Sequence, residues 1–444
     1  AAEKSWSFRT ADGSWDAPHE LEAATTNPGN LVAVQDGQGN TVAIWASQVA
    51  GAFQIRTAVQ NASGDWGDSS RLSTPGNYQA LVPQIRFDSQ GNGLAIWMQL
   101  DQTGAEVWSS RFVKGTGWQA PIRLDRTRNT GFGASLAIDT EGNAFAVWGK
   151  GETEYGNSDI WASRFTPAGG WQAPVRVGSS ANIGIYDQAE QPQVAVDAAG
   201  NAYVLWVQRA SESPVWVARY QVGSGWQPAV SLGAARRGDP YAPRLAVSGS
   251  GQVMALWNAF VPSGTWYRFD LWWSALATPG GSWTSPALLE NDDVGDAMNQ
   301  VLTVDGAGNF HAIWQQQDVS NYRSDLVHRR YTPGVGWEAT TTVSTANGTY
   351  FQNRFPSLVA DRNGNLMALW GVYKSGSGGA EEGTFARRYV AGEGWRATVR
   401  VGATGAAAAA TTSLDVQADG SIAATWMEPV ENRGNGPIFA ARFK

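Results

Sequence analysis

The oxygen-bearing side chains that recur most regularly in this sequence belong to one turn, Asp-x-x-Gly-Asn. Carboxylate, amide and backbone carbonyl oxygens are the ligands that Ca2+ prefers. Each copy supplies only one aspartate, however, and an Asx turn with glycine at positive φ accounts for the same residues. We therefore expect the turn to be structural. The other cation candidate is an acidic segment with Asp292, Asp293 and Asp296, for which a solvated turn is the alternative.

The residue types that usually carry catalysis are scarce or scattered. The three histidines, His19, His311 and His328, fall in predicted strands of different repeats, so neither a histidine metal site nor a triad is expected. The absence of cysteine excludes disulfides, zinc–thiolate sites and cysteine nucleophiles. A carboxylate pair for glycoside hydrolysis needs a defined separation across the fold, and the sequence singles out no pair. No catalytic residue is predicted.

Aromatic and basic side chains gather instead in the segments of variable length. Such residues stack on sugar rings or anchor a protein partner when they are exposed. For the aromatic hairpin around residues 260–273, packing of the hairpin on itself is the alternative. The predicted ligand-binding residues are Trp266, Tyr267, Trp272, Tyr186, Tyr241, Tyr350, Phe351, Arg354 and Arg237.

A repeated motif indicates the elements that position these residues. The motif is Asp-x-x-Gly-Asn-x-x-Ala-x-Trp, and its successive tryptophans lie 51 to 58 residues apart, the unit size expected of propeller blades. Two of the eight copies are degraded. The motif tryptophans are Trp45, Trp97, Trp148, Trp206, Trp257, Trp314, Trp370 and Trp426.

Each repeat predicts four short antiparallel strands. In the second repeat, alternating segments cover 83–87, 93–98, 107–112 and 118–124, separated by turns rich in Gly, Asn and Asp. The last repeat lacks a fourth strand, and residues 15–21 resemble the missing one. We predict an all-β fold: one eight-bladed β-propeller of four-stranded antiparallel blades over residues 1–444, its last blade closed by the N-terminal strand. Residues 7–9 resemble an additional third strand, for which the sequence gives no place.

Two further residues recur and are interpreted as framework. A second tryptophan begins each fourth strand, and recurrence in every repeat predicts packing between sheets. An arginine recurs in the third strand and is expected to pair with the turn aspartate, to stack on the fourth-strand tryptophan, or both. The fifth repeat has Ser248 for the aspartate and Leu276 for the arginine, so both are lost together.

Composition excludes several classes of protein. The net charge is -7, and no basic stripe is present to neutralise phosphates, which argues against nucleic acid. No run of eighteen apolar residues spans a membrane. The lack of cysteine and a first residue other than methionine predict an exported protein, secreted or periplasmic, with its signal peptide removed. No cofactor is predicted apart from the Ca2+ alternative.

The repeat, followed by an Arg-aromatic strand and Gly-Trp-x-x-Pro, resembles large, uncharacterised secreted or envelope repeat proteins of bacteria. The resemblance covers nearly the whole chain and implies export and a propeller, and it brings no established catalytic residues to transfer to this chain. The ring is also similar in outline to propeller lectins, although their sugar-site motifs are not recognisable here. Sialidase Asp-boxes, Ser-x-Asp-x-Gly-x-x-Trp, have a different spacing.

These observations predict a non-enzymatic binding module that recognises a glycan or a protein through the variable-loop face. The alternative is a polysaccharide-active enzyme, a lyase or glycosidase, with its site at the mouth of the central channel. Converging carboxylates, or Tyr/Arg pairs with perturbed pKa values, would favour the enzyme. A shallow aromatic groove without titratable pairs would favour binding. A purely structural spacer is a third alternative.

Overall fold

A computed structural model describes most of the chain. It covers residues 13–23, 27–76, 79–101, 104–127, 133–151, 158–178, 189–208, 214–233, 240–263, 266–290, 295–318, 323–346, 351–374, 382–402, 409, 411–417, 419–428 and 436–444. Within these ranges the regular secondary structure is entirely β-strand. The predicted extra strand at residues 7–9 lies outside them.

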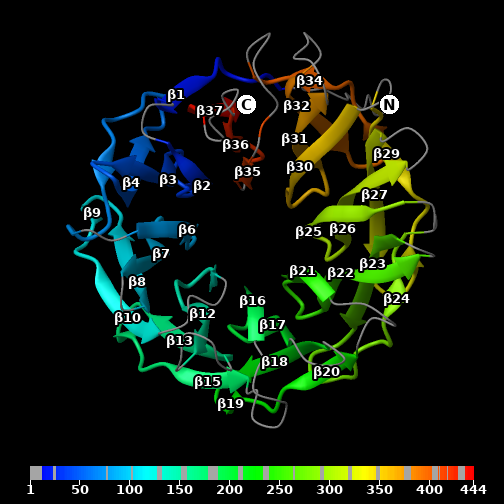
Figure 1. Ribbon diagram of the computed structural model, residues 1–444, viewed down its shortest axis with the longest axis horizontal. Coiled ribbons are helices and arrows are strands. Elements are labelled where there is room, and N and C mark those ends of the chain that lie inside the picture. The colour runs from blue at the N-terminus through cyan, green and yellow to red at the C-terminus, as the bar shows by residue number, and fades with distance from the viewer. Residues whose placement is uncertain are drawn as a thin grey trace, which may run out of the picture.

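The strands form antiparallel sheets that stand around a central axis (Figure 1). Three sheets in the first half of the chain contain β2(Gly29–Gln35), β3(Thr41–Val49), β4(Ala52–Gln60) and β5(Ser70–Arg71); β6(Gln79–Phe87), β7(Gly93–Asp101), β8(Gly104–Val113), β9(Gly117–Trp118) and β10(Ile122–Thr127); and β11(Ala134–Ile138), β12(Ala144–Gly151), β13(Ser158–Thr166), β14(Gly170–Trp171) and β15(Val175–Gly178). The next two contain β16(Ala189–Val196), β17(Ala202–Gln208), β18(Val215–Gln221), β19(Gly225–Trp226) and β20(Val230–Gly233); and β21(Pro240–Val247), β22(Val253–Ser263), β23(Trp266–Leu276) and β24(Ala287–Leu288).

A ten-stranded sheet follows, in which two units are joined by a single parallel pairing, Ser324 with Gln352. The first unit contains β25(Ala297–Val304), β26(Phe310–Asp318), β27(Arg323–Thr332), β28(Gly336–Trp337) and β29(Thr341–Ser344). The second contains β30(Phe351–Ala360), β31(Leu366–Lys374), β32(Gly383–Val390), β33(Gly394–Trp395) and β34(Val399–Arg400).

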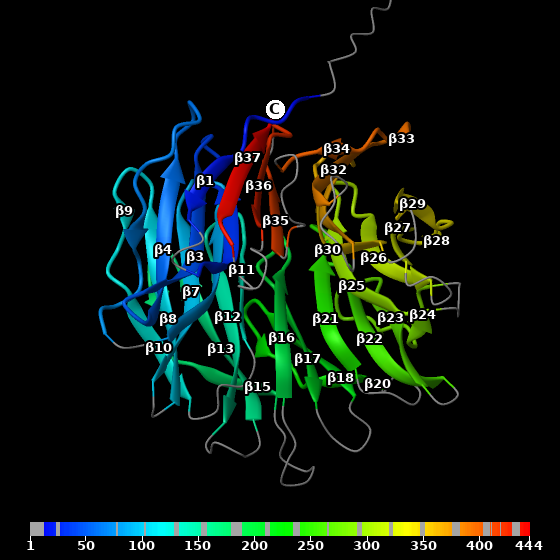
Figure 2. The same ribbon diagram turned by 45° about the horizontal axis from the view of Figure 1, so that its top comes forward.

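The last sheet combines the two ends of the described chain. It contains β35(Thr411–Val416), β36(Ile422–Met427), β37(Ile438–Phe443) and β1(His19–Glu22). His19 lies opposite Ala440 in the antiparallel β1–β37 pair, and Trp15 forms a bridge to Phe443. The chain ends thus meet in one sheet, as Figure 2 shows in blue and red. The prediction of an all-β chain built largely of four-stranded antiparallel sheets is confirmed in the described residues.

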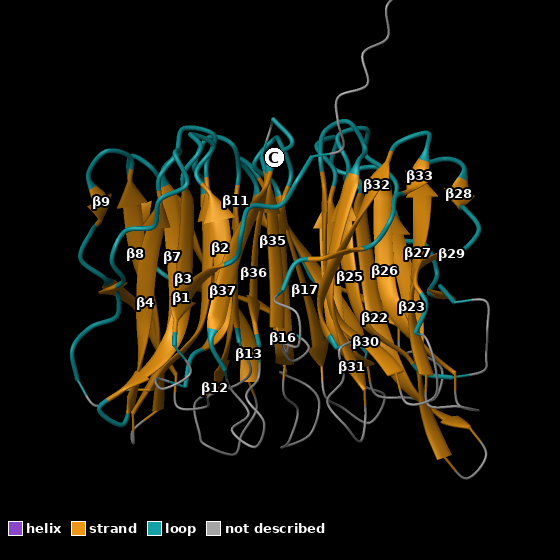
Figure 3. Ribbon diagram, turned by 90° about the horizontal axis from the view of Figure 1, so that it is seen from above, coloured by secondary structure: helices purple, strands orange, loops and turns teal. Residues whose placement is uncertain are grey.

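The outermost strand differs from the prediction, because it is split in several sheets. In the β6–β10 sheet the pairs Gly117–Trp118 and Ile122–Thr127 contact β8 separately. Pro121, which has no N–H to donate, lies between the two pieces. Figure 3 shows the strands standing side by side along the axis, with their short turns at one face.

The recurring turn is an Asx turn, as expected. In the β6–β7 copy, Asp88 Oδ1 accepts the backbone N–H of Gln90 at 2.8 Å and of Asn92 at 2.9 Å, while Oδ2 accepts the Asn92 amide at 3.2 Å. Gly91 has φ +88°, a conformation that glycine adopts without a Cβ clash. The carboxylate is surrounded by N–H donors, so the structural interpretation accounts for it completely.

The motif tryptophans form the core. All eight are at most 2% exposed, and apolar clusters lie between sheets adjacent in the chain and between the last sheet and the β2–β5 sheet. Several indole N–H groups are paired, for example Trp45 Nε1 with Glu22 and Trp426 Nε1 with Glu428. Burial at every repeat explains the recurrence of tryptophan as packing between sheets.

The recurring arginine has a different partner from the predicted ones. Arg111 lies 5.5 Å from the ring of Phe165 on the next sheet, and Arg388 lies 5.4 Å from Phe443 in the same way. No ion pair joins these arginines to turn aspartates within the described ranges. In three copies, Arg111, Arg164 and Arg388, the arginine stacks instead on the third-strand aromatic residue of the neighbouring sheet, which differs from both predicted partners.

The register also corrects two assignments in the arginine series. Arg111 faces Leu94, three residues before Trp97, whereas Arg56 faces Trp45 itself and is outside the series. In the β21–β24 sheet the arginine position is held by Ala275. Leu276 forms the bridge to Trp283 and therefore replaces the aromatic residue, not the arginine.

The first strand of each repeat lies nearest the central axis, and we call it the inner strand. The inner strands have a feature that the sequence interpretation missed. Six of them contain a β-bulge with a non-glycine residue at positive φ, where Val82 (φ 53°) and Phe355 (φ 52°) are the bulkiest. Four of these residues precede proline and two are asparagines. A bulge re-aims the strand end and commonly lies near a functional site. The six residues are Asn30, Val82, Gln191, Ala242, Asn299 and Phe355.

Candidate functional site

A cavity of about 480 Å3 lies at the inner strands of three sheets, β2, β6 and β35. Its walls include the bulge residues Asn30 and Val82 and the polar side chains Gln84, Arg86 and Asp415. In Figure 1 these three strands surround the upper left part of the central axis. The bulges therefore shape the wall of a cavity that is lined by both a guanidinium group and a carboxyl group.

Asp415 is held in place by the backbone of the neighbouring sheet. One of its carboxylate oxygens accepts the N–H of Gln35 at 2.7 Å, which connects β35 to β2. Burial raises the pKa of Asp415 to about 6, although the Gln35 N–H and the Arg86 charge both act to lower it. A carboxyl group with this pKa exchanges a proton near neutral pH, the property required of a general acid or base.

Arg86 is the positive partner in this cavity. Its side chain lines the cavity and is exposed to solvent, and Nη1 donates to the backbone oxygen of Ile85 at 2.7 Å. Burial lowers the pKa of Arg86 and the charge of Asp415 raises it. The guanidinium has five N–H groups, so it can bind an anionic group of a ligand while it keeps the bond to Ile85.

The two charges stand at a position that is otherwise uncharged in the repeat. Arg86 and Asp415 both lie two residues before the turn position. The corresponding residues of the other repeats are Val34, Ala137, Ala195, Ala246, Thr303 and Val359. Alignment of the repeats by this position would have identified both residues from the sequence.

Side chains that connect adjacent inner strands elsewhere are neutral. Gln84 bonds the backbone of Ala134 and Leu136 at 2.8 and 3.0 Å, and Ser135 accepts the N–H of Val194 at 3.2 Å. The β35–β2 junction uses a carboxylate for the same purpose. Since a neutral amide or hydroxyl makes the same bond at lower desolvation cost, the junction alone does not explain an aspartate at this position.

A second group of carboxylates lies between the β21–β24 sheet and β25. Glu290 is buried and accepts the Leu271 N–H through both oxygens, at 2.9 and 2.8 Å. Burial raises its pKa to about 8, so it is protonated at neutral pH. Arg268 Nε lies 2.7 Å from Asp270. Asp296 accepts the Phe269 N–H at 2.9 Å, and burial raises the pKa of this carboxyl as well.

Two histidines form a buried hydrogen-bonded chain, contrary to the sequence interpretation. His311 on β26 and His328 on β27 belong to one sheet, and His311 Nδ1 lies 3.1 Å from His328 Nε2. His311 Nε2 lies 3.2 Å from Asp305 Oδ2, and His328 Nδ1 lies 3.2 Å from Thr341 Oγ1. The sequence interpretation assigned the histidines to different repeats. His311 and His328 are 17 residues apart and stand on two paired strands of the same sheet.

The ionisation of Asp305 fixes one proton of this chain. Burial acts to raise the pKa of Asp305, but hydrogen bonds from His311 and Asn309 lower it to about 2. The ionised carboxylate accepts from His311 Nε2, one proton lies between His311 Nδ1 and His328 Nε2, and the Thr341 hydroxyl donates to the His328 backbone oxygen at 3.4 Å. Burial lowers the pKa of His328 to about 3, so this ring is a poor proton acceptor. The arrangement is a structural chain rather than an activated nucleophile.

The described ligand-binding candidates do not form one site. Tyr241 is 52% exposed, whereas Phe351 is buried. The Arg354 guanidinium lies 4.7 Å from the Tyr373 ring. Trp272 is half-buried in the cluster with Trp257 and Trp283. The remaining candidates, Tyr186, Arg237, Tyr350, Asp292, Asp293 and the side chains of Trp266 and Tyr267, lie outside the described residues.

The described part of the chain contains no group of three or more His, Asp or Glu side chains placed to hold a metal ion. In the same part, no helix is long and apolar enough to cross a membrane.

No protein-family model matches the chain, and no curated protein matches it by sequence. Among solved structures, an ulvan lyase with a bound saccharide aligns over 96% of this chain and 95% of its own, with 12% identity and a TM-score of 0.47. The α-L-arabinofuranosidase Arb93A of Fusarium graminearum aligns over 83% and 95%, with 12% identity and a TM-score of 0.44. The fucoside-binding lectin of Aleuria aurantia aligns over 74% and 99%, with 14% identity and a TM-score of 0.38.

These similarities bear on two predictions, the absence of enzymatic activity and the similarity to propeller proteins. The sequence favoured a chain without enzymatic activity, and this preference is corrected, because several of the similar structures are carbohydrate-active enzymes. The distant similarity to propellers, lectins included, holds. The similar structures thus include a lectin and several enzymes of carbohydrates.

Proposed function

We propose that the chain is an eight-bladed propeller closed into a ring, and that it acts as a polysaccharide-active enzyme. Counting the two units of the ten-stranded sheet separately supports eight blades. Two contacts support closure: the pairing of β1 with β37, and the hydrogen bond from Gln35 to Asp415 between the first and last inner strands. The Trp45 cluster, which includes Met427 and Ile438, belongs to the same junction.

The catalytic site of this proposal is the cavity of Asp415 and Arg86, and the reaction is elimination from a uronate-containing polysaccharide. The single observation that carries the proposal is the pairing of a carboxyl whose pKa is about 6 with a solvent-open guanidinium in one cavity. Arg86 binds the uronate carboxylate and stabilises the negative charge that develops on it. Asp415 removes the proton next to that carboxylate.

The elimination balances without water or a cofactor. The C5–H bond breaks and Asp415 takes the proton. The electron pair forms the C4–C5 double bond, the C4–O bond to the next sugar breaks, and Asp415 returns the proton to the leaving oxygen. A group that accepts and then donates a proton works best when its pKa lies near the operating pH. The neutral residues Asn30 and Gln84 of the cavity are suited to bind sugar hydroxyls.

The test is conversion of purified uronate polysaccharides, with neutral polysaccharides of the same size as controls. Products are followed by the ultraviolet absorbance of the new double bond and by mass. Asp415→Asn is expected to lower kcat by about 10^2-fold or more. Arg86→Gln is expected to raise KM and lower kcat, and Arg86→Lys to restore part of both. Thermal unfolding of each variant shows whether the fold persists. Absence of unsaturated product from every uronate substrate, or full activity of Asp415→Asn, would refute the proposal.

Hydrolysis is the second candidate, favoured by the protonated Glu290 close to Asp270 and Arg268. A protonated carboxyl beside an ionised one is the arrangement of glycosidases. Hydrolysis adds water to the products and gives no double bond, so the same assay separates the two reactions. Glu290→Gln would then abolish turnover while Asp415→Asn would not.

A further inference from the structure

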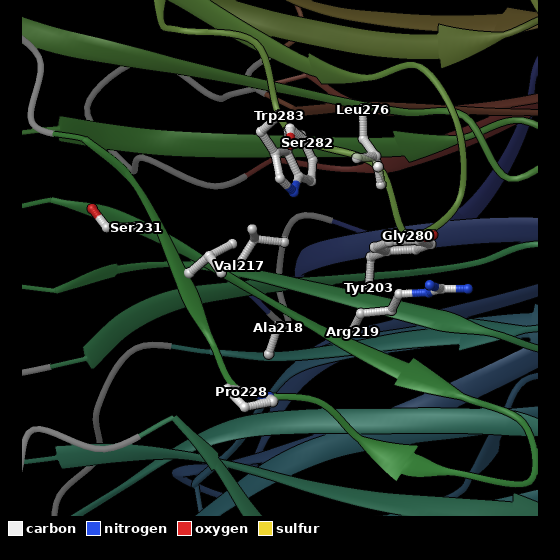
Figure 4. A pocket seen from close by; sticks show the side chains of 12 residues that line it. Tyr203, Val217, Ala218, Arg219, Pro228, Ser231, Leu276, Gly280, Ser282 and Trp283 are labelled. Carbon is white, nitrogen blue, oxygen red and sulfur yellow. The ribbon is translucent and has the colours of Figure 1, made fainter.

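A second cavity, of about 390 Å3, lies between the β16–β20 and β21–β24 sheets, on the other side of the axis from β2, β6 and β35 (Figure 1). Figure 4 shows the side chains that line it. Tyr203 and Arg219 come from the first sheet, and Leu276, Ser282 and Trp283 from the second. The cavity therefore combines aromatic, hydroxyl and cationic groups from two neighbouring sheets.

The cavity exists because the β21–β24 sheet departs from the repeat. At the preceding junction the same space is filled by rings, since Phe145 lies 4.8 Å from Tyr220 and 5.8 Å from Trp226. Leu276 replaces the ring of Tyr220 at the junction with Tyr203. The hairpin to Trp283 is also one residue longer and contains Gly280 at φ +79° beside Arg219. Both changes open space next to the tryptophan.

Two polar atoms of this cavity have no partner among the described residues. Tyr203 is 1% exposed, and its hydroxyl makes no hydrogen bond. The buried Nε of Arg219 is also unbonded, and its guanidinium lies 5.8 Å from the Tyr203 ring because the neighbouring sheet offers no ring to stack on. Buried polar groups are nearly always paired, so each unpaired one needs an explanation.

The nearby carboxylate does not occupy these donors. Asp197 acts electrostatically on Tyr203. It already accepts the N–H groups of Ala199 and Asn201 at 2.9 Å and the Asn201 amide at 2.9 Å. Arg219 and the Tyr203 hydroxyl are therefore left for an acceptor that enters the cavity.

We infer that this cavity binds one acidic sugar residue, with the indole of Trp283 and the apolar side chains against the ring and Arg219 and Tyr203 on the carboxylate. A pocket with apolar walls and a few convergent polar groups is typical of a small-ligand site. The choice of an acidic sugar rests on the proposed function, because the uronate polymer supplies such residues. The site is a second one, separate from Asp415 and Arg86, and holds the polymer away from the reacting bond.

The experiment is calorimetric titration with methyl β-D-glucuronide, which carries no leaving sugar and is not turned over. Methyl β-D-glucoside is the matched neutral probe. We expect the glucuronide to bind at least about tenfold more tightly. The titrations are made in Arg86→Gln, which removes the guanidinium of the first cavity. In that protein Arg219→Gln is expected to abolish the preference, and Tyr203→Phe to weaken glucuronide binding about 5- to 10-fold. Leu276→Phe, which restores the ring that stands at this position in most sheets, is expected to eliminate glucuronide binding.

Tyr220→Phe removes a tyrosine hydroxyl at the filled junction and serves as the control, expected to bind as Arg86→Gln alone does. Tyr203→Phe changes no volume beyond one oxygen, so it keeps the test decisive if Leu276→Phe fails to fold. Unchanged affinity in both Tyr203→Phe and Arg219→Gln would overturn the inference. If that result comes with elimination of uronate polysaccharides, the proposed function still stands. If the glucuronide binds as expected and no polysaccharide is converted, the second site stands and the proposed function fails.

Discussion

Replacing Glu290 and His328 separately by glutamine is expected to change the pH dependence of folding stability in opposite directions. Both residues are nearly buried, and the fold keeps both uncharged. The folded pKa of Glu290 is about 8 against an ordinary 4.5, and that of His328 is about 3 against 6.5. One group therefore favours the folded state at low pH and the other at higher pH.

The signs follow from proton binding by the two states. For Glu290, the folded chain keeps a proton that the unfolded chain releases above pH 4.5, so stability falls as pH rises from 4.5 to about 8. For His328, the unfolded chain takes up a proton below pH 6.5 that the folded chain rejects, so stability falls as pH decreases from 6.5 to about 3. Between pH 4 and 7 each contribution is roughly 3 kcal/mol, at 1.36 kcal/mol for each pKa unit.

The two contributions to the pH dependence oppose each other in the wild type. Each one is therefore measured as the difference in unfolding free energy between the wild type and the variant that lacks that group. Relative to wild type, Glu290→Gln should gain roughly 3 kcal/mol in unfolding free energy when the pH is raised from 4 to 7. His328→Gln should gain about as much when the pH is lowered from 7 to 4. Urea unfolding at both pH values measures these differences. The exposed residues Glu20 and His19 provide the matched control variants Glu20→Gln and His19→Gln.

Parallel pH profiles for wild type and Glu290→Gln would show that Glu290 ionises normally in the folded chain. The reasoning from burial would then be wrong for this residue, and with it the case for hydrolysis by a protonated Glu290. If the pH profile of His328→Gln also runs parallel to that of the wild type, His328 ionises normally in the folded chain. The pKa reasoning for the buried hydrogen-bonded chain from Asp305 to Thr341 would then be wrong.

Three further outcomes test the framework and the site. Asp88→Ala removes an acceptor of three hydrogen bonds and should lower the free energy of unfolding by about 1–3 kcal/mol in urea titrations, whereas Gln417→Ala at the degraded copy should cost less. Trp97→Ala should cost about 3–5 kcal/mol and the half-buried Trp118→Ala clearly less, so equal losses would contradict the assignment of the core. Asparagine tolerates positive φ, so Val82→Asn should keep or raise thermal stability, by up to about 1 kcal/mol; a large loss would show that the bulge is unstrained.

The sequence predicted whatever recurs in the repeat. Turn chemistry, the buried tryptophan and the antiparallel strands each follow from local residue types, and the missing fourth strand of the last repeat indicated the pairing of β1 with β37. The partner of the arginine was not predictable in this way, because Arg111 stacks on Phe165 of another sheet. Contacts between sheets depend on twist and register, which a spacing count within one repeat does not contain.

The candidate sites were missed for a related reason. The prediction placed ligand binding at the variable-loop face because aromatic residues are frequent in those loops. The titratable groups of the candidate cavity, Arg86 and Asp415, stand on the strands β6 and β35 instead. When the repeats are aligned with one another, Arg86 and Asp415 stand at a position that is uncharged in the other repeats. Leu276 stands at a position that is aromatic in most repeats. His311 and His328 needed the pairing of β26 with β27.

A ring of repeated sheets explains why such exceptions mark sites. Each sheet contacts only its neighbours, so a residue that departs from the repeat changes one junction and leaves the others intact. At the β17–β23 junction a leucine replaces one ring beside the unpaired Tyr203 hydroxyl and the Arg219 guanidinium. At the β35–β2 junction a carboxylate replaces the neutral bridge and keeps a raised pKa. Neither change strengthens packing, and a fold of similar junctions tolerates both locally. Their occurrence at positions that most repeats fill with uncharged or aromatic residues is accounted for by the ligand chemistry proposed for those two junctions.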